Sequence, residues 1–307
     1  MNRGVFGGGA LLGATVFFAA LASGAVIPSA TNNSVLDSDK FSVEYTIYSQ
    51  VTDAAELTKK FTDLGYYLPD IREGLEDVPR LMLVNFPNDL IELHSVEKRK
   101  ALFIQALLPI VLQANEKIVI ERTKLLSLLM QTNSSWTKND HDWISDLHQR
   151  YKVEETNLEE LLRRVDIIPP SLALAQAAVE SGWGTSRFAQ EGNAVFGQWT
   201  YEPSQGIAPA EASSGSRHYV KSFEGLSDSV VSYFLNLNSH YAYSSFRNRR
   251  KIMQEQIGSL DSFSLANTLL YYSEKREIYV DAIRSIIKRN DLVSYDKARL
   301  REANATQ

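Results

Sequence analysis

Glu180 is the residue whose type and position most strongly suggest chemistry. It lies in the segment from 169 to 200, PPSLALAQAAVESGWGTSRFAQEGNAVFGQWT, just before two glycines. The C-terminal end of a helix carries partial negative charge and therefore disfavours a carboxylate. That charge, with burial beside Trp183 and Phe188, would raise the pKa of Glu180, as a general acid requires. The alternative is a surface glutamate that happens to precede a turn.

The helix that must position Glu180 has a recognisable start and end. Pro169 and Pro170 prevent an earlier helix from continuing, and we expect Ser171 to cap the new helix. Gly182 and Gly184 are expected to end it. One face of a helix is predicted by the i, i+3, i+4, i+7 spacing of Leu172, Ala175, Gln176 and Val179.

The run AQAAVESGWGTSRFA, followed by NAVFGQW, resembles the glucosaminidase family of peptidoglycan hydrolases. The run FGQWTY at 196–201 is most similar to the bacterial Bax-like members, and the resemblance covers roughly 90–287. It implies a lysozyme-like fold in which Glu180 is the catalytic acid. It also implies a sugar cleft with Trp183, Asn193, Phe196, Gly197 and Trp199.

Two tyrosines extend the same resemblance. In LLYYSEKREIYVDAI, Tyr272 and Tyr279 match the family's tyrosine motif near the floor of the cleft. Two departures are Ser273-Glu274 in place of Ala-Thr and one extra residue between the tyrosines. A tyrosine can stack on a sugar and donate a hydrogen bond, so we expect both to bind substrate. The alternative is a core tyrosine with a satisfied hydroxyl.

Glycosidic hydrolysis usually needs a second carboxylate as base or nucleophile. The segment after Trp199 offers Glu211, whose location is the most hairpin-like, with Glu202 and Glu224 as alternatives. Glu224 could instead favour the N-terminal dipole of a helix. None has the Thr-Glu-Tyr context typical of the family, and the acetamido group of the substrate could replace the second carboxylate.

The amino-acid composition argues against nucleic-acid binding and against a metal site. The 307 residues carry a net charge of −5, which argues against nucleic-acid binding. Cysteine is absent, and the five histidines show no HExxH spacing, so we expect no metal and no cofactor.

The N-terminus predicts an extracytoplasmic address. Arg3 followed by the apolar run ALLGATVFFAALA at 10–22 is typical of a signal peptide, and the uncharged stretch is also long enough for an anchor. We therefore assign 1–30 to a signal peptide or N-terminal anchor. The rest would lie in the periplasm, free or anchored to the inner membrane.

The remaining pattern predicts a mainly α (α+β) protein, with a lysozyme-like helical lobe, a small β-hairpin lobe and additional N-terminal helices. Residues 31–89 form a linker and a small region with a strand near 43–47, a helix over 53–64 and an extended run RLMLVNF. A long helix over 95–129, kinked or broken at Pro109, opens a glucosaminidase-like domain at 90–290. Its catalytic core occupies about 155–290, and 291–307 is a polar tail whose end, RLREANATQ at 299–307, we expect to be frayed.

The sequence thus predicts a hydrolase of the β-1,4 bonds of peptidoglycan glycan strands at N-acetylglucosamine. Three alternatives remain: a lytic transglycosylase, an N-acetylmuramoyl amidase, and a non-catalytic glycan-binding protein.

Overall fold

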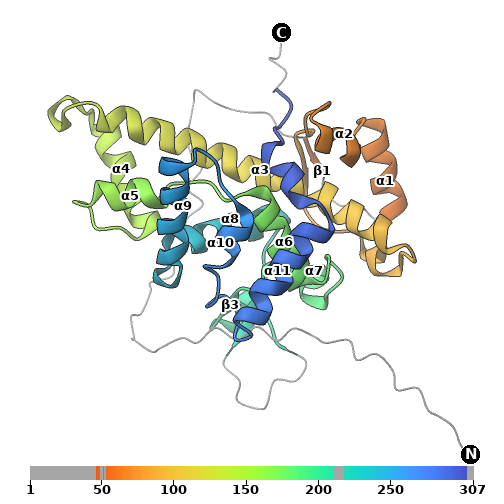
Figure 1. Ribbon diagram of the computed structural model, residues 1–307. Coiled ribbons are helices and arrows are strands. Elements are labelled where there is room, and N and C mark those ends of the chain that lie inside the picture. Colours follow the sequence, from red (N-terminus) through yellow and green to blue (C-terminus); the bar gives the residue numbers. More distant parts are fainter. Residues whose placement is uncertain (1–45, 49–50, 52, 210–217, 303–307) are drawn as a thin grey trace, which may run out of the picture.

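The computed structural model describes residues 46–48, 51, 53–209 and 218–302, and its central element is helix α6 (Figure 1). Helix α6 spans Pro170–Ser181 and is buried along almost all of its length. Four alanines at 173, 175, 177 and 178 keep it slim, so α11 (Glu277–Arg289), α3 (Val96–Leu129) and α10 (Ser262–Ala266) all pack against it. The carboxyl-bearing end of α6 is therefore held from several sides.

Helix α3 is one continuous helix, and the predicted break at Pro109 does not occur. Its apolar stretch is long enough to cross a membrane, but 72% of that stretch is buried inside the protein. It packs against α6, α8 (Leu226–Ser239) and β2. We attribute the continuity through Pro109 to this packing, which offsets the missing backbone donor.

The N-terminal region follows the predicted order. Strand β1 (Thr46–Tyr48) pairs in parallel with β2 (Leu81–Leu83). Helix α1 (Ala54–Asp63) begins after Asp53, whose side chain accepts from the Glu56 amide. Helix α2 (Leu68–Glu73) and the 3-10 turn η1 (Asn88–Glu92) complete this region.

Several further helical segments lie between these elements in the sequence. They are η2 (Asn133–Ser135), α4 (Lys138–Tyr151), α5 (Leu158–Arg164), α7 (Arg187–Gly192), η4 (Tyr241–Tyr243) and α9 (Ser244–Gln256). Asn157 caps α5 as its capping-box-like position predicted. Helix α10 is short and begins after Asp261, whose side chain accepts from the Phe263 and Ser264 amides.

A small antiparallel sheet forms the β-lobe. Strands β3 (Trp199–Thr200), β4 (Gly206–Ile207) and β5 (Tyr219–Lys221) have the order β3-β5-β4, and η3 (Pro203–Gln205) lies between the first two. Together with the helices, this sheet confirms the mainly α fold with a small β-lobe that a lysozyme-like architecture predicts.

The C-terminal segment corrects two sequence-based expectations. The tail is not simply polar, because η5 (Leu292–Lys297) buries Leu292 and Tyr295 against α6 and α11. Its described end is not frayed either, since Val78 donates to the Arg299 carbonyl and accepts from the Arg301 amide, both at 2.8 Å. Ser171 is not the cap of α6, which begins at Pro170. Instead, the Asp296 carboxylate accepts hydrogen bonds from the Ser171 amide (2.8 Å) and hydroxyl (2.7 Å).

Candidate active site

Glu180 lies in the last turn of α6, where the glycine-rich turn ends the helix as predicted. Gly182 is left-handed (φ 58°), and so are Trp183 (φ 60°) and Gly184 (φ 78°). Glu180 as a residue is half-buried, but its Oε1 atom is buried and has no hydrogen-bond partner among the described residues. Burial raises the pKa of Glu180 from 4.5 to about 8, opposed by a hydrogen bond from Tyr279 and the charge of Lys275. The carboxyl is therefore mainly protonated at neutral pH.

Gly197 leaves room for that carboxyl. A Cβ atom at this position would lie 2.9 Å from Glu180 Oε2. The backbone of Gly197 also has φ of +61°, which other residues rarely adopt. Two independent constraints thus require glycine where the loop passes the carboxyl.

A buried chain of hydrogen bonds leads to the same carboxyl. The Tyr233 hydroxyl donates to Gln176 Oε1 at 2.6 Å, and Gln176 Nε2 donates to the Tyr279 hydroxyl at 2.9 Å. Because the Tyr279 oxygen already accepts from Gln176, its own proton is available to Glu180. The sequence motif assigns no role to Gln176 or Tyr233, although a polar Gln on the apolar face of α6 is a signal that could have indicated one.

Phe196 and Tyr272, which were predicted to line the cleft, are instead buried in the core. Phe196 is buried and stacks on the Tyr233 ring with centroids 3.8 Å apart. Tyr272 is fully buried; its hydroxyl donates to the Phe196 carbonyl at 3.0 Å, and its ring stacks on Tyr279. Tyr272 thus has the satisfied hydroxyl of the alternative reading, whereas Tyr279 reaches Glu180 directly.

The other predicted residues lie along the loop and the adjoining lobes. Asn193 is buried, and its Nδ2 donates to the carbonyls of Phe223 and Glu224, both at 3.3 Å. Trp183 is half-buried against Phe103, with its ring 4.9 Å from Lys100 Nζ. Trp199 on β3 is also half-buried. Both tryptophans are partly exposed, so each can stack against a sugar ring.

No other carboxylate among the described residues contributes to the raised pKa of Glu180. Glu202 and Glu224 are both exposed, and neither contributes to the raised pKa of Glu180. Glu211, the favoured candidate, lies outside the described residues. Within the described part of the chain, no group of three His, Asp or Glu side chains could hold a metal ion.

Comparison with known proteins agrees with this geometry. The glucosaminidase family model, described as mannosyl-glycoprotein endo-beta-N-acetylglucosaminidase, matches residues 155–292. Protein bax of Escherichia coli strain K12 is 33% identical over 197 residues, which cover 62% of this chain and 69% of that protein. No solved structure matches significantly. The chain therefore belongs to the glucosaminidase family, as a Bax-like member.

Proposed function

We propose that this protein hydrolyses the β-1,4 glycosidic bonds of peptidoglycan strands at N-acetylglucosamine, with Glu180 as the general acid. Family membership implies a glycan-cleaving, peptidoglycan-related hydrolase. What we propose beyond the family is the cleaved β-1,4 bond, the role of Glu180 and the general acid mechanism. The observation that carries it is the buried, protonated carboxyl of Glu180 at the open turn that ends α6.

The acid step follows from the protonation state. A glycosidic oxygen is a poor leaving group unless it receives a proton as the bond breaks. With a pKa of about 8, Glu180 holds that proton at neutral pH. Tyr279, fixed by Gln176, can then hydrogen-bond to the carboxylate that forms. No other described side chain combines a raised carboxyl pKa with the family motif.

The stabilisation of the sugar cation is the second part of the mechanism. No other described carboxylate contributes to the raised pKa of Glu180, and attack by the acetamido group of the substrate itself is the route that needs no second carboxylate. Glu211 would be the alternative if its segment brings it to the cleft.

The same observation supports a second candidate, a lytic transglycosylase. That reaction needs one acidic residue, which protonates the leaving oxygen and then takes a proton from the sugar hydroxyl that closes the anhydro ring. The two reactions differ in their products, a reducing sugar in one case and an anhydro sugar in the other.

The proposed location is extracytoplasmic, where peptidoglycan lies. The family and the similarity to Protein bax favour it. The segment 1–30, assigned to a signal peptide or anchor, lies outside the described residues.

Mass spectrometry of fragments released from purified sacculi tests the function. We expect reducing N-acetylglucosamine ends from the parent protein and a loss of about 10²–10⁴-fold in cleavage for Glu180→Gln, since glutamine cannot donate the proton. Single changes of Glu202, Glu211 and Glu224 to Gln identify any second carboxylate.

The same spectra distinguish the other candidates. Anhydro ends would indicate a lytic transglycosylase, and free stem peptides an amidase. Glycan binding without any released fragment would indicate a non-catalytic protein. Normal cleavage by Glu180→Gln would refute the role of Glu180.

A further inference from the structure

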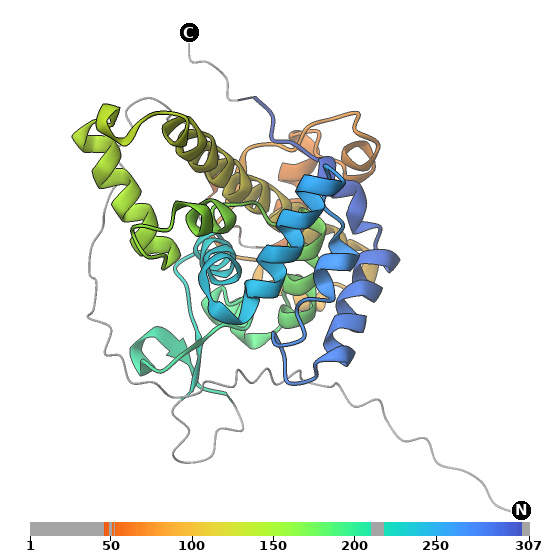
Figure 2. The same ribbon diagram turned by 60° about the vertical axis from the view of Figure 1, so that its left-hand side comes forward.

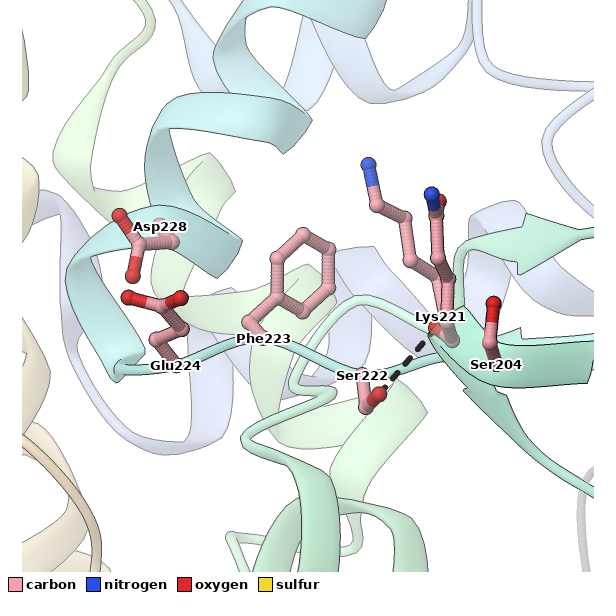
Figure 3. A pocket seen from close by; sticks show the side chains of 7 residues that line it. Ser204, Lys221, Ser222, Phe223, Glu224 and Asp228 are labelled. Atoms are coloured by element: carbon pink, nitrogen blue, oxygen red, sulfur yellow. Dashed lines mark hydrogen bonds between the residues drawn. The ribbon is translucent and has the colours of Figure 1, made fainter. Parts of the chain in front are cut away.

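A pocket of about 510 Å³ lies between the β-lobe and the start of α8, beside the loop that carries Gly197 (Figure 3). Two contacts connect it to the candidate active site. The Lys221 amide in the pocket wall donates to the Gln198 carbonyl at 2.7 Å, and Gln198 directly follows Gly197. Asn193 holds the carbonyls of Phe223 and Glu224 from the other side. The pocket wall thus contacts both Asn193 and the loop that passes Glu180.

The pocket has opposite charges at its two ends. Figure 3 shows the carboxylates of Glu224 and Asp228 on one side of the Phe223 ring, and the side chain of Lys221 on the other. Lys221 Nζ lies 5.2 Å from the centroid of the ring. The aromatic ring therefore separates an anionic end from a cationic end.

Apart from the contact of Lys221 with the Phe223 ring and one hydrogen bond to Asp228, these charges have no partner among the described residues. Neither the Lys221 ammonium nor the Glu224 carboxylate forms an ion pair or side-chain hydrogen bond with a described residue. Asp228 uses Oδ2 to accept from the Gly225 amide at 3.0 Å, which leaves its second oxygen available. The pocket can therefore pair with an amine at one end and a carboxylate at the other.

We infer that this pocket binds the peptide stem carried by the glycan strand. A free amine of the stem would lie against Glu224 and Asp228, a carboxylate against Lys221, and the apolar chain between them over Phe223. The inference rests on the proposed function and names the part of the substrate that the protein recognises besides the sugar. The volume lies within the range of about 300–1,000 Å³ typical of small-molecule sites.

The competing explanation is that the two carboxylates serve only the fold. They lie at the N-terminal end of α8, where the helix dipole favours negative charge. In that case Glu224→Gln would lower the melting temperature without changing ligand preference. Binding and stability must therefore be measured together.

The test measures binding in the Glu180→Gln protein, so that no substrate is consumed. Calorimetry gives the Kd of a disaccharide carrying a stem peptide with a free side-chain amine, and the Kd of the same disaccharide without the peptide. We expect tighter binding of the peptide-bearing ligand. Lys221→Met and Glu224→Gln should each reduce that preference by about two- to fivefold, as for the loss of an exposed ion pair.

Matched controls use charges outside the pocket. Lys117→Met and Glu154→Gln change exposed residues of the same types and should leave the preference unchanged. Equal binding of the two ligands, or a preference unaffected by Lys221→Met and Glu224→Gln, would overturn the inference while the glycan-binding function stands. Binding of neither ligand would instead count against the proposed function itself.

Discussion

The carboxyl of Glu180 determines how activity should depend on pH. Burial raises its pKa from 4.5 to about 8, and only the protonated form can donate to the leaving oxygen. We therefore expect cleavage to fall as pH rises through about 8. Cleavage rates on purified glycan, measured from pH 5 to pH 10, give a pH–rate profile whose alkaline limb reports this decrease. A limb near pH 4–5, as for an ordinary glutamate, would contradict the assignment.

The same shift predicts an effect on stability. Between pH 4.5 and about 8 the folded state keeps a proton that the unfolded state has released, so stability decreases as pH rises through this window. Glu180→Gln cannot ionise. Its melting temperature should therefore increasingly exceed that of the parent protein towards pH 9, by about 2–4 °C per kcal/mol. The exposed control Glu154→Gln should show no such trend.

Gly197 offers a separate test of the geometry at the carboxyl. Gly197→Ala places a methyl group 2.9 Å from Glu180 Oε2 and strains a backbone with φ of +61°. Gly258→Ala is the matched control, because its φ is +75° and a Cβ there meets nothing within 4 Å. Both changes should lower stability by roughly 1–2 kcal/mol, but only Gly197→Ala should abolish cleavage. Equal activity of the two variants would show that the carboxyl does not need this space.

Gln176 should act through Tyr279 as a positioning residue. Gln176→Met removes the donor that fixes the Tyr279 hydroxyl. Because the hydrogen bond from Tyr279 lowers the pKa of Glu180, its loss should move the alkaline limb of the pH–rate profile to higher pH. Tyr233→Phe, which removes only the more distant hydroxyl, should leave that limb in place. Identical limbs in both variants would assign Gln176 a purely structural role.

At the scale of elements, local sequence patterns predicted most helices, but they did not predict the long-range contacts that stabilise these helices. The glycines after Ser181, the Ser95 cap of α3 and the Asn157 cap of α5 are all encoded within a few residues of their helices. The cap of α6 is not, because it comes from Asp296, 125 residues away from Ser171. The C-terminal sequence looked like a polar tail because its partner on α6 lies far away in the chain.

Asp296 is therefore expected to stabilise the element that carries Glu180. It accepts from the Ser171 amide and from the hydroxyls of Ser171 and Ser262. Asp296→Ala would leave the Ser171 amide without its acceptor, and the Ser171 and Ser262 hydroxyls only with each other, at a cost of about 1–3 kcal/mol. Thermal unfolding measures the loss. The control Asp281→Ala changes an exposed aspartate of α11, and a similar loss there would remove the special role of Asp296.

At the scale of the whole molecule, the site depends on contacts that no local motif contains. The motif at 176–197 predicted the fold family and Glu180. Two hydrogen bonds connect Gln176 to Tyr233, 57 positions away in the sequence, and to Tyr279, 103 positions away. Only the folded structure reveals these contacts. The second carboxylate stays a prediction, since Glu211 lies outside the described residues.

The core also extends beyond the region 155–292 that the family model matches. Phe103 of α3 contacts Trp183, and a Cβ at Gly184 would lie 3.2 Å from its ring. Asn115 of α3 donates to the Ile168 carbonyl at 2.7 Å and accepts from the Ile168 amide at 3.0 Å. The glycine turn and the segment before α6 thus both contact a helix that the family match leaves out. Figure 2 shows this helix, α3, in olive to yellow beside the green helices.

We expect this dependence to decide which fragments fold. A fragment of residues 155–292 would expose the apolar face of α6 that α3 covers and would lose the Asp296 cap. A fragment of residues 46–302 retains both. Thermal unfolding followed by circular dichroism should therefore show a cooperative transition for 46–302 and none for 155–292. A cooperative transition and glycan cleavage by 155–292 alone would mean that α3 and η5 are accessory to the catalytic unit.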